Sequence, residues 1–179
     1  MLDEDKEEES KPVSNYTIML PNAGPMLTVF SKDLYFLNMA YDTANMSIIS
    51  FQHGAVLVYK RDVISTGYNS ICKLRDTTND RMASCHAEAM AVINAIMKMG
   101  NKIHSRNLSL YVTRRTKSGK FGESSPCTHC TEIMQKYKIG TLVYTTHTGD
   151  VIKKKLKDYV PRKGARVTIR NRYTWNSNK

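Results

Sequence analysis

The sequence predicts an α/β fold in which helices cover a mixed β-sheet. Two kinds of apolar pattern support this prediction: short runs typical of strands, and longer segments with the 3.6-residue spacing of helices. The two kinds follow one another along the chain, which is typical of a sheet covered by helices. A length of 179 residues suits one domain with one hydrophobic core.

The first half of the chain predicts one helix and one β-hairpin. Ser31 has the character of an N-cap, and the apolar residues behind it recur at helical spacing, which predicts a helix over 32–47. Two apolar runs, 55–59 and 63–67, flank a short polar turn and predict a hairpin. The polar segment 69–84 has no clear period, so we expect a loop there.

The second half predicts two more helices, each followed by a strand. A continuous apolar stripe indicates a helix over 86–99, and Gly100 is placed to end it. A shorter helix is expected over 127–137, and the two strands over 108–112 and 141–144. Each of the two helices begins with a segment rich in potential metal ligands.

The connections and the end of the chain are less regular. Residues 116–126 are expected to form a loop rich in Gly, Ser and Lys. Residues 148–150 predict a hairpin turn, after which the chain could pair back as a strand or form a helix over 151–160. The direction of the last strand is therefore left open. Residues 167–169 alternate as a late strand.

The charge is uneven, with a net charge of +11. Residues 1–12 hold six acids against two lysines, and ten of the basic residues lie between 153 and 179. We expect an acidic disordered tail over 1–14, a domain over 15–170 and a basic tail over 171–179. A basic body favours phosphate-bearing partners, from nucleotides to nucleic acids, although a solvated charged surface also accounts for it.

The N-terminus has no apolar segment of a secretory signal, and no apolar run is long enough to cross a membrane. We therefore expect a cytoplasmic protein without membrane contact. Cys72 and Cys85 are expected to be buried free thiols. The other two cysteines, Cys127 and Cys130, have a spacing that predicts metal binding.

Two short segments predict a catalytic zinc site. Cys127 and Cys130 lie three residues apart in the first turn of a predicted helix, so both sulfurs point the same way. His86, at the start of the other helix, supplies a third ligand. Three protein ligands leave a position for water, which distinguishes a catalytic zinc from a structural one. A structural zinc knuckle would need a second ligand pair, and a redox pair would need a thioredoxin-like setting.

Glu88 lies two residues after His86, close to the expected metal without binding it. A carboxylate in this place can take a proton from an activated water and pass it to a leaving nitrogen. We therefore expect Glu88 to be the catalytic acid and base.

These segments, His86-Ala87-Glu88 and Pro126-Cys127-Thr128-His129-Cys130, resemble those of the cytidine and deoxycytidylate deaminase superfamily. The resemblance spans about residues 35–160. It implies a three-layer sandwich around a five-stranded mixed sheet with helices on both faces, a zinc cofactor, and deamination of a cytosine base. It also implies that Asn69 contacts the substrate and that the backbone of Ala87 meets the edge of the base.

The resemblance leaves the substrate open among nucleotides, nucleosides and polynucleotides. Our leading hypothesis is a CMP or dCMP deaminase in which Arg75 and Arg81 hold the phosphate. The alternatives are a cytidine or deoxycytidine deaminase, a deaminase of tRNA or single strands, and a zinc-stabilised nucleic-acid-binding module. We expect a homo-oligomer with a small-molecule substrate, and nucleic acid is a possible partner that we do not favour.

Overall fold

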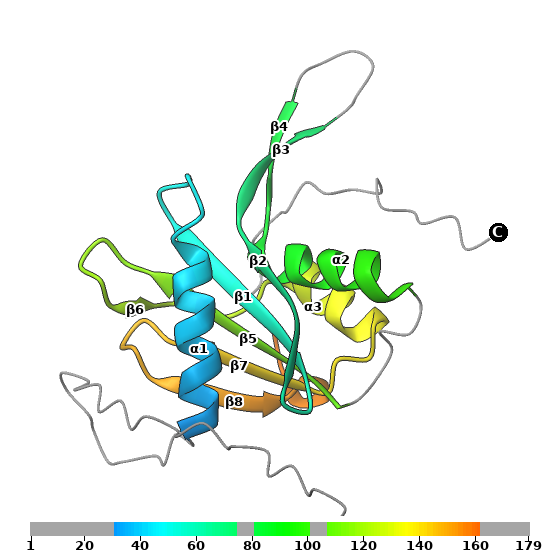
Figure 1. Ribbon diagram of the computed structural model, residues 1–179. Coiled ribbons are helices and arrows are strands. Elements are labelled where there is room, and N and C mark those ends of the chain that lie inside the picture. Colours follow the sequence, from blue (N-terminus) through cyan, green and yellow to red (C-terminus); the bar gives the residue numbers. More distant parts are fainter. Residues whose placement is uncertain (1–30, 75–80, 101–106, 162–179) are drawn as a thin grey trace, which may run out of the picture.

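The computed structural model describes residues 31–74, 81–100 and 107–161 (Figure 1). In this part of the chain, six strands form the main sheet, one more than the five expected, because the two-residue β6 pairs with β5. The other five follow the order β2-β1-β5-β7-β8. The pairing of β5 with β7 is parallel and the other described pairings are antiparallel, so the sheet is mixed. The strands of the main sheet are β1 Gln52–Tyr59, β2 Asp62–Tyr68, β5 Leu108–Arg115, β6 Phe121–Gly122, β7 Thr141–Thr145 and β8 Val151–Lys155.

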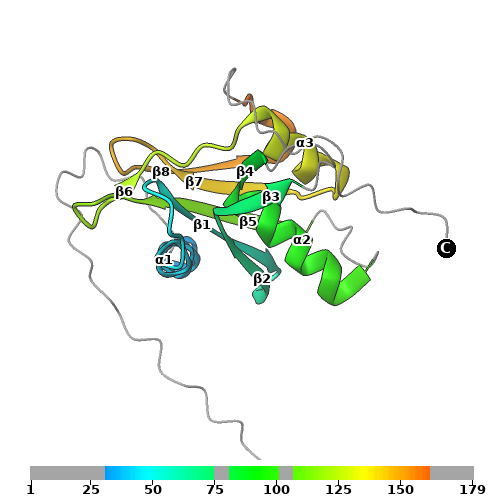
Figure 2. The same ribbon diagram turned by 90° about the horizontal axis from the view of Figure 1, so that it is seen from above.

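Helices cover both faces of this sheet, as predicted. Helix α1, Ser31–Ala44, packs on one face, while α2, Ala87–Met99, and α3, Thr128–Lys136, pack on the other. Figure 2 shows α1 and α3 on opposite sides of the strands. The fold is therefore a three-layer sandwich. Helices α2 and α3 lie in the same layer, so both of them begin on the same side of the sheet.

The alternation of side chains along the central strands builds a separate core on each face. Val56 of β1 and Tyr111 of β5 pack with α1, whereas Leu57 and Leu110 pack with α2 and α3. Successive residues of a strand point to opposite faces of the sheet, and here helices cover both faces. All four side chains are therefore at most 3% exposed.

Two glycines allow the helices to approach the sheet closely. A Cβ at Gly54 would lie 1.9 Å from the carbonyl oxygen of Ala40 in α1. On the other face, a Cβ at Gly67 would lie 2.3 Å from the amide nitrogen of Ala91 in α2. Both obstacles are backbone atoms, so the position of each helix depends on the absence of a side chain.

The segment expected to be a loop over 69–84 contains a hairpin instead. Its strands are β3, Ser70–Leu74, and β4, Arg81–Cys85, and they form a separate two-stranded sheet. Figure 1 shows this hairpin projecting beyond the main sheet, above α2. A hairpin that stands apart from the main sheet has less need of alternating apolar residues, so the sequence pattern did not predict it.

Cys85 ends β4 and corrects a second expectation. Its side chain is buried, as expected, but it is disulfide-bonded rather than free. Cys72 lies on the paired strand opposite Ala83, and its side chain lies outside the described part of the chain. The expectation of a free thiol at Cys85 is therefore wrong, because it rested on how cysteines usually behave in a reducing compartment and not on where this residue lies in the fold.

The end of the described chain forms a strand, which decides between the two expected alternatives. The turn before it has Gly149 at φ +89°, a conformation that glycine adopts without strain. Strand β8 then pairs antiparallel with β7, and a short 3₁₀ helix, Leu156–Asp158, follows. The expected tails, 1–14 and 171–179, and the expected strand at 167–169 lie outside the described residues. None of the described helices has both the length and the apolar character needed to span a membrane.

Candidate active site

Three predicted metal ligands meet between the starts of α2 and α3. The Nδ1 atom of His86 lies 3.5 Å from Sγ of Cys127 and 3.4 Å from Sγ of Cys130. One ligand atom of each residue lies within 4.8 Å of those of the other two. His86 and Cys127 are 41 residues apart in the sequence, so the tertiary structure brings them together.

The two helix starts position these ligands. His86 is the N-cap residue of α2, and Cys127 is the N-cap residue of α3, each with extended backbone angles. Their carbonyl groups accept the first helical hydrogen bonds, from the amides of Met90 and Thr131, while their side chains remain available for other contacts. Cys130 follows one turn later on α3 and is fully buried.

The donor set and its geometry fit zinc. Tetrahedral zinc has Zn–S and Zn–N distances of about 2.3 and 2.0 Å, which places neighbouring ligand atoms about 3.6 Å apart. The two measured distances from His86 to the sulfurs agree with this spacing. One imidazole and two thiols are the ligands of a catalytic zinc that keeps its fourth position open.

The electrostatics of the site favour a thiolate at Cys127. The hydrogen bond from Cys130, together with that from His86, lowers the pKa of Cys127 to about 4 against the opposing effect of burial. The same bond with Cys127 raises the pKa of His86. The hydrogen bond with Cys127 and burial hold the pKa of Cys130 well above its usual value. Cys127 is therefore the more acidic of the two thiols.

Glu88 lies beside the ligands in the first turn of α2. Its side chain is buried, with 6% of its surface exposed. The negative charge of Glu88 contributes to raising the pKa of both His86 and Cys130, which requires the carboxylate to be close to them. The arrangement thus combines a metal-binding trio with a buried carboxylate that is not part of the trio.

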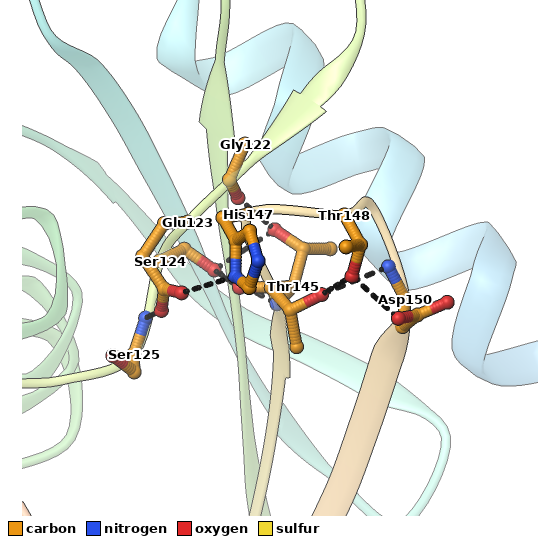
Figure 3. Close-up of polar contacts among 9 residues, drawn as sticks. Gly122, Glu123, Ser124, Ser125, Thr145, His147, Thr148 and Asp150 are labelled. Atoms are coloured by element: carbon orange, nitrogen blue, oxygen red, sulfur yellow. Dashed lines mark hydrogen bonds and ion pairs between the residues drawn. The ribbon is translucent and has the colours of Figure 1, made fainter.

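The loop before Cys127 is anchored by buried hydroxyl groups, which sequence patterns did not indicate. Ser124 Oγ donates to the carbonyl oxygen of Val112 at 2.9 Å and accepts the amide hydrogen of Thr145 at 2.8 Å. Thr145 Oγ1 in turn donates to the carbonyl oxygen of Gly122 at 2.6 Å. Figure 3 shows how these contacts fasten the loop to the end of β7.

A hollow of about 420 Å³ adjoins this loop. Its walls come from the loop before α3, including Ser125, from the turn between β7 and β8, and from Tyr144 and Tyr159. The lining residues, all of them described, include the carboxylates of Glu123 and Asp150 but neither Lys nor Arg. This hollow is poorly suited to a phosphate.

The predicted substrate contacts are only partly described. Asn69 is 6% exposed, and its amide accepts from the backbone of His53 and donates to the carbonyl oxygen of Phe51, both at 2.7 Å. Ala87 is fully buried at the start of α2. Arg75 lies outside the described residues, and for Arg81 the backbone of β4 is described but not the side chain.

The chain is similar in fold to a cytidine deaminase from Burkholderia pseudomallei. The two share 20% identity and a TM-score of 0.53 over 72% of this chain and 95% of that one. A dCMP deaminase from the cyanophage S-TIM5 matches with 17% identity and a TM-score of 0.47, over 64% of this chain and 82% of that one. A search of curated proteins returned no relative of this sequence.

The model of one protein family matches residues 30–146 and includes the three ligands and Glu88. The family is described as the cytidine and deoxycytidylate deaminase zinc-binding region. Because the match covers most of the chain and the ligand geometry fits the metal, the cofactor is zinc. The chain belongs to the cytidine and deoxycytidylate deaminase family.

Proposed function

We propose that this chain is an enzyme that hydrolyses the exocyclic amine of CMP or dCMP, releasing the uracil nucleotide and ammonia. The observation that supports this most directly is the trio of His86, Cys127 and Cys130 beside the buried carboxylate of Glu88. A zinc ion held by the trio supplies an activated water, since zinc lowers the pKa of a bound water to about 7.

The chain's own residues move the protons of this reaction. Glu88 accepts a proton from the attacking water as its oxygen bonds to C4 of the base. Glu88 then donates a proton to the exocyclic nitrogen, so that the C4–N bond breaks and the amine leaves as ammonia. Burial of Glu88 excludes bulk water from this transfer.

The remaining contacts orient the substrate. The backbone of Ala87 borders the edge of the base, next to His86 and Glu88. Asn69 retains one amide hydrogen beyond its two described bonds, and this hydrogen is available to a sugar hydroxyl. Its bonds to the backbone of Phe51 and His53 hold the amide in one orientation.

The charge distribution supports a phosphate contact on the hairpin side of the site. The hollow beside the α3 loop carries two carboxylates, so a phosphate is disfavoured there. The β3–β4 hairpin, by contrast, leads directly into His86. Arg75 follows β3 in the sequence, and Arg81 opens β4 opposite Leu74, at the end of the hairpin away from Cys85. Their positive charge alone makes them the candidate phosphate ligands.

A substrate panel tests the proposal. The zinc-loaded enzyme is assayed for ammonia release with cytidine, deoxycytidine, CMP, dCMP and short cytosine-containing RNA and DNA. We expect the highest kcat/KM for CMP or dCMP. In the double variant Arg75→Ala/Arg81→Ala, KM should rise far more for the nucleotide than for the nucleoside.

A matched variant controls for the loss of charge. Lys154 of the edge strand β8 and Lys157 of the 3₁₀ helix that follows it are exposed lysines, and Lys154→Ala/Lys157→Ala removes the same charge. This variant should leave the KM for CMP or dCMP unchanged. Equal kcat/KM for dCMP and deoxycytidine would instead indicate a nucleoside deaminase. Activity confined to RNA or DNA would indicate a polynucleotide deaminase.

A further inference from the structure

Both peptide groups that flank the zinc ligand Cys127 accept a hydrogen bond from a side chain. On its N-terminal side, the hydroxyl of Tyr159 donates to the carbonyl oxygen of Pro126 at 2.7 Å. On its C-terminal side, the hydroxyl of Thr131 donates to the carbonyl oxygen of Cys127 at 2.9 Å. The amide of Thr131 donates to the same oxygen at 3.0 Å.

These hydrogen bonds help to set the direction in which the thiolate of Cys127 points. The Cα of Cys127 joins the two peptide planes, so the planes together set its φ and ψ and the direction of its Cα–Cβ bond. The helix itself accounts for the bond from the Thr131 amide. The bond from Tyr159 has no such origin, because Tyr159 lies 32 positions later in the sequence and outside the helix.

The ring of Tyr159 is itself fixed. Its side chain is 7% exposed and belongs to the core cluster that contains Met134 of α3 and Leu156. Its ring meets that of Tyr144 edge-on, with centroids 5.6 Å apart and an interplanar angle of 73°. A buried phenol held in this way can direct its hydroxyl at one acceptor with little freedom to turn elsewhere.

We propose that Tyr159 is a positioning residue of the zinc centre, which acts through the Pro126 carbonyl to orient Cys127. Thr131 is its counterpart on the other side of the ligand. The segment after β8 thereby contributes to a site whose ligands come from α2 and α3. This role concerns the metal and not the base, so it stands whichever substrate the enzyme takes.

The test measures zinc affinity by competition with a chelator, together with the absorption of the cobalt-substituted protein. Tyr159→Phe keeps the ring and removes only the hydroxyl. We expect its zinc Kd to rise about 10–100-fold, as is usual when a group that orients a metal ligand is lost. The cobalt bands that report thiolate ligation should shift. Thr131→Val should weaken zinc in the same way, and Thr131→Ser should restore it.

A second buried tyrosine serves as the control. Tyr111 is 3% exposed and its hydroxyl donates to Asp33 at 2.8 Å, on the α1 face of the sheet. Tyr111→Phe also loses a buried hydrogen bond, so it should lower stability yet leave the zinc Kd and the cobalt spectrum unchanged. The proposal is overturned if Tyr159→Phe binds zinc like the wild type, or if Tyr111→Phe weakens zinc to the same extent.

Discussion

At the scale of single residues, Glu88 carries the part of the proposed mechanism that the metal ligands do not supply. It lies in the first turn of α2, two residues after His86, and is almost fully buried. Its charge influences the pKa of both His86 and Cys130. The same side chain is therefore close to the ligands without being one of them.

The change Glu88→Gln tests this role. Glutamine keeps the size of the side chain but cannot take up a proton, so we expect turnover to fall at least about a hundredfold while zinc stays bound. The measurement is the steady-state rate together with the zinc content. Glu132→Gln, on the exposed side of α3, is the matched control and should behave like the wild type. Wild-type turnover in zinc-loaded Glu88→Gln would refute the proposed mechanism.

At the scale of elements, the position of α2 against β2 decides where His86 and Glu88 stand. Gly67 allows the contact, since a Cβ there would lie 2.6 Å from the carbonyl oxygen of Ala87. That carbonyl belongs to the residue next to His86. A shift of α2 away from the sheet would therefore move the start of the helix and the ligand at its N-cap.

We expect Gly67→Ala to lower the free energy of unfolding by about 1–3 kcal/mol, the usual cost of overpacking. It should also weaken zinc binding, because the start of α2 must move. Gly54→Ala makes the equivalent clash with α1 on the other face and should cost stability without changing the zinc affinity of the folded protein. Urea unfolding of the zinc-free proteins and zinc titration separate the two effects. Equal zinc affinities in both variants would show that α2 does not need this contact.

At the scale of the whole molecule, the zinc site joins the starts of two helices that also pack against each other. His86 belongs to the start of α2, and Cys127 and Cys130 belong to α3. A metal bound by both segments stabilises the folded chain, because the site does not exist in the unfolded one.

Zinc should therefore raise the temperature of unfolding. At a free zinc concentration a hundred times Kd, the stabilisation is about 2.7 kcal/mol, which corresponds to about 5–10 °C in Tm for a chain of this size. Thermal unfolding with zinc and with a chelator measures the difference. Cys127→Ala should lose both the bound zinc and the response of Tm. Full zinc occupancy in Cys127→Ala would contradict the assignment of the ligands.

The sequence by itself determined the chemistry of the site. The spacing of Cys127 and Cys130 and the step from His86 to Glu88 each lie within one helical turn, where distances follow from helix geometry alone. It also determined that helices cover a mixed sheet, since the period of apolar residues distinguishes helices from strands, whereas the three layers were implied by the resemblance to the family. Both kinds of information are local, and local patterns are what a single sequence displays.

Only the tertiary structure decided the rest. It decided that His86 and Cys127 meet, that residues after 150 pair back as β8, and that Tyr159 reaches the carbonyl before Cys127. It also revealed the β3–β4 hairpin, which forms a separate two-stranded sheet that projects beyond the main one. Contacts between distant segments depend on how the helices and strands pack. The periodicity of one segment shows which of its sides is buried, but not which other segment it will contact.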